Sequence, residues 1–434
     1  MLVGQLAVLG NGVIDTVMAG QRSATDLAIV GLGASIYISI FVGFRGVLTG
    51  LAPIVAGHFG GGRLHEIGND VGQAVWVGLL LALIGMPLLL WTDPWMAIIR
   101  PDPNVIGPLS SYLHAIAIAL PATMMFSIFF ILNSATSRPA ITMAVNLAAL
   151  ALKWPLNLIC MDGIEGWLAP MGAVGCAVST AILAWLSMLA ALALLAADRR
   201  YREFRVRISK PQKRRIGELL RIGVPIGIGT MIEVTSFTLM ALLIGSFGIV
   251  ASASHQVAAN VATIAFMIPM ALSNATSVLA AQAIGARNES GARAWVFTGM
   301  WLVLAIATAV TLLILLLREP IAAFYAQNPD VRALASELII LAAICHVLDA
   351  FQCLLYSVLR AWRITLRPML VYGVSLWGLG VGGGWVLATI VLPPDAGAAR
   401  GFWVGNFAGL LCACIGLWLL LRSRLVDPVH AIKP

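Results

Sequence analysis

Three carboxylates lie deep inside apolar stretches of this sequence, where a charged side chain is costly. They are Asp15 in "GNGVIDTVMAG", Glu233 in "TMIEVTSF" and Asp349 in "CHVLDAFQ"; the rest of the 19 acidic residues lie in loops or near the ends of apolar stretches. A carboxylate facing lipid costs about 2.5–3.5 kcal/mol on insertion scales. Carboxylates kept at such positions bind cations or carry protons, although a buried salt bridge that joins helices is the structural alternative. The three residues therefore predict a cation or proton site.

Two basic residues are also interior, Arg45 in "VGFRGVL" and Lys153 in "ALKWPLN". Asn157 follows Lys153 by one helical turn, so the two side chains share a helix face. We expect Lys153 to act as the charge partner of a carboxylate. Arg45 is expected either to line a wet cavity or to play a structural part.

The composition indicates an integral membrane protein. Of the 434 residues 60% are hydrophobic and 11% are charged, and the mean hydropathy is +0.95, whereas soluble domains carry about 25% charged residues. The net charge of +8 does not indicate a nucleic-acid partner, because the basic residues lie in short loops rather than on one face. The cysteines lie in or beside apolar runs and predict neither disulfides nor a zinc site.

Apolar runs long enough to cross a bilayer recur along the whole chain, separated by loops that contain Gly, Pro and Asn. Residues 1–19 are interpreted as a retained span rather than a cleaved leader. The twelve predicted spans are residues 1–19, 27–56, 70–91, 109–133, 139–161, 170–196, 217–245, 250–275, 292–317, 333–358, 368–391 and 401–421.

The segment "DRRYREFRVRISKPQKRR" divides the spans into two sets of six. Lys and Arg lie on one side of the membrane with a bias of about four to one, which places both termini and this segment in the cytoplasm. It is expected to be a tether beside anionic lipid, with a specific lipid site as the alternative. The predicted domains are an N-terminal lobe (1–197), a basic cytoplasmic linker (198–216), a C-terminal lobe (217–425) and a cytoplasmic tail (426–434).

The two halves repeat short patterns in the same order. "TSRPA" at 136–140 opens the fifth span and "TLRPM" at 365–369 opens the eleventh. Six spans in each half is an even number, so both halves enter the membrane from the same side. The sequence predicts an all-α polytopic membrane protein whose twelve transmembrane helices form two six-helix bundles. The bundles are expected to be related by a parallel pseudo-two-fold repeat and to face a central cleft.

Signals for enzymatic chemistry are weak. The glycine-rich "FGGGR" at 59–63 follows a predicted helix and lacks the Lys-Ser/Thr of a phosphate-binding loop. His255 and His346 have no second ligand at helical spacing, and no nucleophile-base pair is evident. We expect a protein that is not an enzyme, with no cofactor and no metal beyond Na⁺ as one candidate coupling ion.

A series of motifs resembles the NorM-type multidrug and toxic compound extrusion (MATE) transporters over almost the whole chain. They are "GVIDTVMAGQRSATDLAIVGLGASI" (12–36), "LAPIVAGHFGGGR" (51–63), "PLNLICMDG" (155–163), "GAVGCAVSTAI" (172–182), "EVTSF" (233–237), "HQVAAN" (255–260) and "LDAFQ" (348–352). The resemblance implies antiport, in which inward H⁺ or Na⁺ drives the export of small lipophilic, often cationic, drugs and dyes. It also implies residence in a bacterial inner membrane, and a monomer is expected.

The resemblance assigns roles to the interior residues. Asp15 matches the carboxylate of the first helix, which binds the coupling proton or ion, and Asn157 matches a polar residue near it. Glu233 and Asp349 match an acidic pair of the C-terminal lobe associated with cation binding.

Further positions match less securely or depart from the family. Gln256 and Asn260 match a polar motif of the eighth span and are candidate cleft-lining residues. Many relatives carry Asn at the position of Lys153, and a tethered ammonium there would compete with Na⁺. We hypothesise that Lys153 pairs with Asp15 in one state, so that protonation of Asp15 releases it. Relatives also carry a longer segment before the first span, so the natural start is expected upstream of Met1.

Two other functions stay open. A lipid-linked sugar flippase shares the two-bundle plan in the wider superfamily, but its cleft should be strongly basic, and here interior carboxylates outnumber interior bases three to two. A membrane-embedded transferase would need a polar catalytic cluster near one membrane face, which the sequence does not show. Either would be distinguished from an antiporter by ion-driven drug exchange.

Overall fold

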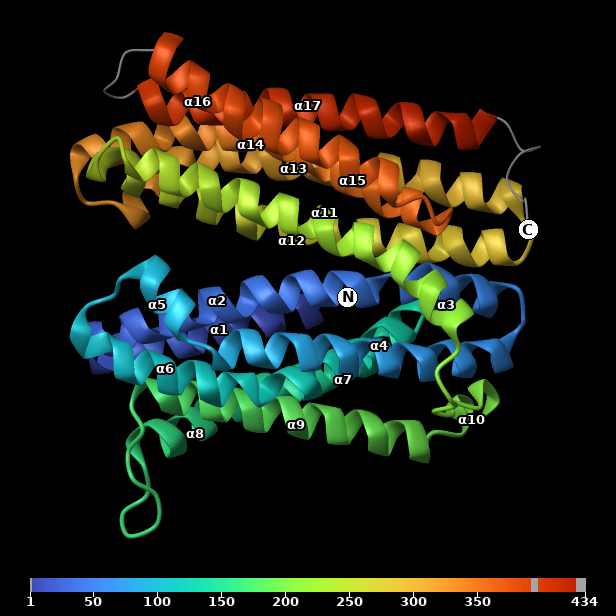
Figure 1. Ribbon diagram of the computed structural model, residues 1–434. Coiled ribbons are helices and arrows are strands. Elements are labelled where there is room, and N and C mark those ends of the chain that lie inside the picture. The colour runs from blue at the N-terminus through green and yellow to red at the C-terminus, as the bar shows by residue number, and fades with distance from the viewer. Residues whose placement is uncertain (1, 392–396, 427–434) are drawn as a thin grey trace. The chain divides into compact units, whose positions relative to one another are not determined.

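The computed structural model describes residues 2–391 and 397–426, almost all of which are helical (Figure 1). An isolated β-bridge joins Ile164 and Leu168 in a loop that projects beyond the helix ends. In chain order the helices are α1 (Leu2–Arg22), α2 (Ala24–Thr49), α3 (Leu51–Gly60), α4 (Leu64–Leu90), α5 (Asp93–Ile99), α6 (Pro103–Ala117), α7 (Ala119–Ala135), α8 (Pro139–Asp162), α9 (Ala173–Ala197), α10 (Arg199–Phe204), α11 (Lys213–Gly245), α12 (Ile249–Gly285), α13 (Glu289–Tyr325), α14 (Pro329–Ala361), α15 (Leu366–Tyr372), η1 (Gly373–Gly383), α16 (Gly384–Val386), η2 (Leu387–Val391) and α17 (Gly397–Val426).

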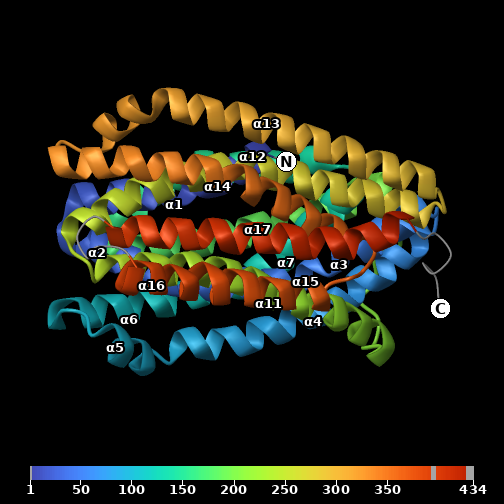
Figure 2. The same cartoon turned by 90° about the horizontal axis from the view of Figure 1, so that it is seen from above.

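The long helices have the length and composition of membrane spans. Within the described residues, eleven helices qualify, and α6 with α7 forms a twelfth if the bent pair is counted as one span. Neighbouring spans such as α13 and α14 run side by side (Figure 2). The predicted all-α polytopic membrane fold is confirmed, and the chain is a multi-pass membrane protein.

Three spans are less regular than the sequence predicts. The predicted span 27–56 is formed by α2 and α3, which together pass as one long helix, Ala24–Gly60. The predicted span 109–133 is bent by 40° between α6 and α7, because Pro121 has no amide hydrogen to donate to the carbonyl of Ala117. The predicted span 368–391 is largely π-helical and rich in glycine.

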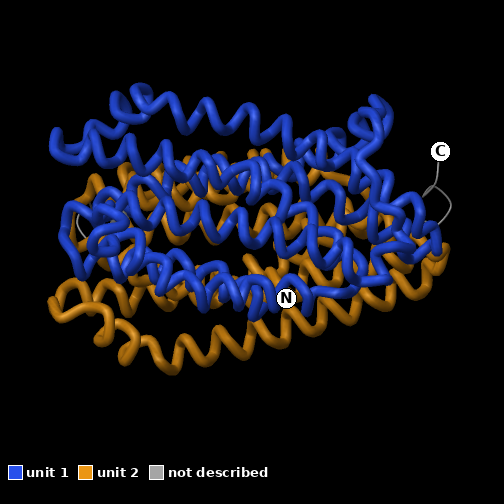
Figure 3. The backbone as a smooth tube through the Cα atoms, turned by 90° about the horizontal axis from the view of Figure 1, so that it is seen from below, with its two compact units in different colours: residues 1–227 blue, residues 228–434 orange. Residues whose placement is uncertain are grey.

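The chain divides into two compact units, Met1–Gly227 and Ile228–Pro434 (Figure 3). The division falls inside α11, whereas the sequence places the lobe boundary at the linker. The reason is that the backbones of α11 and α2 lie in close contact. A Cβ atom on Gly223 would be only 2.0 Å from the carbonyl oxygen of Val47, so the two helices can approach this closely only with glycine at position 223. The start of α11 therefore packs with unit 1. Of the predicted tail 426–434, only residue 426 is described.

Unit 1 is built so that three helices meet around the middle of α1. Helix α1 packs against α8 and α2, and α8 packs against α9. The far side of α9 packs on α7 and α6, and α7 packs on α4. This arrangement places Asp15 of α1, Lys153 of α8 and the small polar residues of α9 together.

Unit 2 is organised around α14. Helices α12, α13 and α14 pack against one another, and α17 packs on α14 and η1. Helix α14 is the most buried of the spans, because its neighbours cover it on several sides. Asp349 is thus carried by the central helix of the unit.

Candidate functional site

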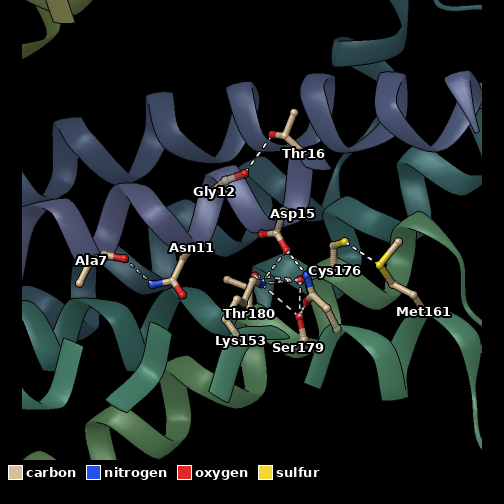
Figure 4. Close-up of polar contacts among 11 residues, drawn as sticks. Ala7, Asn11, Gly12, Asp15, Thr16, Lys153, Met161, Cys176, Ser179 and Thr180 are labelled. Carbon is tan, nitrogen blue, oxygen red and sulfur yellow. Dashed lines mark hydrogen bonds and ion pairs between the residues drawn. The ribbon is translucent and has the colours of Figure 1, made fainter. Parts of the chain in front are cut away.

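Asp15 lies against α8 in the interior of unit 1 and forms an ion pair with Lys153 (Figure 4). The Asp15 Oδ1 and Lys153 Nζ atoms are 2.9 Å apart, and the two side chains are 12% and 1% exposed. Asn157 donates from Nδ2 to the same Oδ1 at 2.7 Å. The carboxylate therefore has one charged and one neutral donor.

The sequence of α8 explains how one helix supplies both donors. Lys153 and Asn157 are four residues apart, so their side chains lie one above the other on the face that meets α1. Pro155 lies between them inside the helix and leaves the carbonyl of Ala151 without its amide donor. Irregular backbone of this kind persists at membrane depth only where it is enclosed by protein or lines a cavity.

Helix α9 completes the environment of the ammonium. Lys153 Nζ donates to Thr180 Oγ1 at 2.5 Å, to Ser179 Oγ at 3.1 Å and to the Cys176 carbonyl oxygen at 3.4 Å. An ammonium has three hydrogens to donate. With the Asp15 oxygen it faces four acceptors, so each hydrogen of the ammonium has a partner available.

The charges of Asp15 and Lys153 cancel, and protonation of Asp15 would break the ion pair between them. Ser179 also donates to Asn157 Oδ1, which fixes the amide with its Nδ2 toward Asp15. Protonation of Asp15 would remove its attraction for Lys153, while the three oxygens of α9 would still hold the ammonium. A free inorganic cation would have to displace the ammonium in order to reach Asp15.

Arg45, on α2, has a different environment. Its guanidinium lies 5.1 Å from the ring centre of Phe130 and 5.9 Å from that of Phe41. No carboxylate pairs with it within the described residues. The aromatic contacts stabilise the charge by cation–π interaction, so the side chain is held in the protein even without an anion.

The acidic pair of unit 2 has no counterpart to Lys153. Glu233, on α11, and Asp349, on α14, are each half-buried. Asp349 Oδ1 accepts a hydrogen bond from Gln352 Nε2 at 2.9 Å, whereas the Glu233 carboxyl makes no hydrogen bond or ion pair with the residues that the structure describes. Asp349 is near enough for its charge to act on Glu233.

One base, Arg360, acts on Glu233 through its charge. It lies near the end of α14 and donates to Ser357 Oγ and, at 3.4 Å, to Asn274 Oδ1. Its guanidinium carbon lies 5.6 Å from the ring centre of Tyr356. None of these partners is an anion, so among the described residues Arg360 can attract Glu233 without forming a fixed pair.

Gln256 and Asn260 lie one turn apart on α12. Gln256 Nε2 donates to Asn260 Oδ1 at 3.3 Å, and Gln256 is exposed while Asn260 is half-buried. The pair presents amide groups on one helix face, which suits contact with a polar ligand or water. Their role as cleft-lining residues stays a prediction.

Comparison with known proteins identifies the family. The MatE family model matches residues 1–159 and 225–386. The chain belongs to the MatE family. The probable multidrug resistance protein NorM of Aromatoleum aromaticum is 36% identical over 431 residues, which cover 99% of this chain and 93% of the relative. The multidrug resistance protein MdtK of Pectobacterium atrosepticum is 32% identical over 438 residues, covering 100% and 95%.

Solved structures share the fold of this MatE chain. The eukaryotic MATE transporter AtDTX14 superposes with a TM-score of 0.86 at 18% identity, covering 97% of this chain and 93% of that one. The bent form of the Vibrio cholerae MATE transporter VcmN gives a TM-score of 0.83 at 18% identity, covering 98% and 95%. The predicted membership of the MATE family is confirmed.

The structure adds residues to the site that sequence reasoning did not assign. Ser179 and Thr180 belong to the motif "GAVGCAVSTAI", whose hydroxyls in an apolar helix were an available signal. Arg360 lies just beyond the predicted span 333–358, so hydropathy does not mark it as an interior residue. The spacing along one helix did not reveal that α9 would face Lys153.

Proposed function

We propose that this MatE protein is a secondary efflux antiporter that exports lipophilic, often cationic, drugs and dyes in exchange for inward cations. The names of its relatives at 32–36% identity as multidrug resistance proteins support the substrate class. The family of transporters to which it belongs supports transport rather than catalysis. We further propose that it acts as a monomer in a bacterial inner membrane with both termini in the cytoplasm, as the bias of basic loops favours.

Among the described residues deep in the spans, the carboxylates without a fixed basic partner, Glu233 and Asp349, outnumber the one base without a carboxylate, Arg45. This balance supports cationic rather than anionic substrates. Lys153 is neutralised by Asp15, so it does not offer an anion a free positive charge. Glu233 and Asp349 remain carboxylates without a fixed basic partner among the described residues. A lipid-linked sugar flippase, whose substrate carries phosphates, would need the opposite balance.

The observation that carries the coupling proposal is the ammonium held against Asp15. Because Lys153 occupies the position that a free cation would take, the ion that acts at Asp15 is proposed to be a proton. Protonation from outside breaks the pair and favours one state of the transporter, and release of the proton inside restores the pair. Each proton that enters also gains about 2.3 kcal/mol per 100 mV of membrane potential.

Exchange in liposomes tests this proposal. Ethidium transport by the wild type is expected to follow an imposed pH gradient and to respond far less to an imposed Na⁺ gradient. Lys153→Asn removes the ammonium and supplies an amide oxygen, so this variant is expected to gain a response to Na⁺. A Na⁺ requirement of the wild type that disappears in Asp15→Asn would contradict proton coupling, and absence of ethidium exchange under every gradient would contradict efflux itself.

A further inference from the structure

The basic segment of residues 198–215, called the strap below, is fastened along α4 by specific hydrogen bonds. The Gln73 amide donates to Ser209 Oγ at 2.9 Å and accepts from the Gln212 backbone amide at 2.7 Å. Trp76 Nε1 donates to the Ser209 carbonyl oxygen at 2.9 Å. The middle of the strap is thus fixed to the third and fourth turns of α4.

Ion pairs fix both ends of the strap. At its start, Asp198 pairs with Arg138 at 2.5 Å, and the Arg138 guanidinium lowers the pKa of the Asp198 carboxyl. At its end, Arg215 reaches Asp70 at 2.7 Å and Glu66 at 2.5 Å. All of these contacts lie within unit 1.

The backbone of the strap also lies directly on α4. A Cβ on Gly68 would be 2.0 Å from the carbonyl oxygen of Phe204, and a Cβ on Gly72 would be 2.2 Å from that of Arg207. The rings of Tyr201 and Phe204 are buried. The strap is therefore a fixed part of unit 1 and differs from an extended polar tether.

Fixing the backbone leaves a concentrated positive surface. Glu203 is the one exposed acidic residue of the strap. Within the described residues no ion pair neutralises the exposed basic side chains, which are Arg199, Arg200, Arg202, Arg205, Arg207, Lys210, Lys213 and Arg214. Such a density of like charge is costly unless anions accompany it.

The position of the strap along α4 indicates which kind of anion would bind its exposed basic side chains. Trp76 of α4, which donates to the strap, is 37% exposed, and the next turns of α4 expose Leu80 and Leu83 at 47% and 70%. Ile208, beside Arg207, is 65% exposed. Tryptophan prefers the membrane interface, so the strap reaches the level at which polar surface gives way to lipid-facing apolar surface.

We propose that the strap is a binding site for anionic phospholipids of the cytoplasmic leaflet. Arg205, Arg207 and Lys210 contact the headgroup phosphate, and Ile208 lies against the acyl boundary. The exposed apolar side chain among the charges distinguishes a lipid from a free phosphate or a nucleic acid, neither of which would gain from it. The proposal concerns lipid binding and is independent of which ion drives transport.

Native mass spectrometry of the full-length protein from nanodiscs tests the site. Wild type is expected to retain phosphatidylglycerol in preference to phosphatidylcholine. The triple variant Arg205→Gln, Arg207→Gln, Lys210→Gln is expected to lose affinity by roughly fivefold per charge, on the order of 100-fold in all. The matched triple variant Arg293→Gln, Arg367→Gln, Arg422→Gln removes equal charge from unit 2 and should retain the lipid as wild type does.

Two further arms make the outcome decisive. Inorganic phosphate at millimolar concentration is expected not to displace the lipid, and displacement would show a simple anion site instead. Gln73→Ala removes the hydrogen bonds of Gln73 to the strap without altering the charge of the strap. This variant is expected to weaken lipid retention, and its thermal unfolding shows that the protein remains folded. Equal losses in the two triple variants, or unchanged retention in both Gln73→Ala and the strap triple variant, would overturn the proposal.

Discussion

Asp15→Asn is expected to lose proton-driven export and to be markedly less stable than the wild type. The substitution leaves the Lys153 ammonium, 1% exposed, without its charged partner in the interior of unit 1. Breaking a buried ion pair by removing one partner typically costs about 3–5 kcal/mol. The measurements are ethidium exchange in liposomes under a pH gradient and the thermal unfolding midpoint of the purified protein in detergent.

A double variant separates the two effects. Asp15→Asn combined with Lys153→Met removes both charges, so most of the lost stability should return while proton-driven exchange should not. Lys153→Met alone is expected to be milder than Asp15→Asn, because the remaining carboxyl can bind a proton and still accept from Asn157. Wild-type stability of Asp15→Asn would contradict a stabilising ion pair, and normal proton-driven exchange by Asp15→Asn would remove the pair from the coupling mechanism.

The interior charges and the pairing of Lys153 with Asp15 were predictable from the sequence, but the partners that α9 supplies were not. Asp15, Lys153 and Asn157 could be selected because a charge or an amide stands out in an apolar helix, and helical spacing places Lys153 and Asn157 on one face. The contact with Ser179 and Thr180 depends on the packing of α9 against α8. Hydropathy carries no information about which helices are neighbours.

The regular parts of the fold were also easier to predict than its distortions. Long apolar runs fix the existence of a span, because a backbone in lipid must satisfy its own hydrogen bonds. The bend at Pro121 had a visible signal, since proline lacks the amide that a straight helix needs. The attachment of the strap to α4 had no such signal in the sequence, because a run of arginines suggests a solvated tether. The attachment depends on Gln73 and on two glycines of α4, which lies far from the strap in the sequence.

Glu233→Gln and Asp349→Asn are expected to abolish most export while leaving stability unchanged. Among the described residues neither carboxylate has a basic partner fixed to it, so neutralising it removes a desolvation cost and breaks no fixed ion pair. An interaction with a charged group contributes about 1.5–3 kcal/mol, which corresponds to a loss of roughly 10- to 100-fold in exchange rate. The same exchange and thermal unfolding assays used for Asp15→Asn measure both quantities.

Asp330→Asn is the matched control, because Asp330 is exposed in the first turn of α14, the helix that carries Asp349. It should transport and unfold as the wild type does. A large loss of stability in Glu233→Gln or Asp349→Asn would instead identify a structural contact like the one at Asp15. Normal export by both variants would remove the acidic pair from the mechanism, because a carboxylate that binds the transported cation has to be charged in order to compete for it.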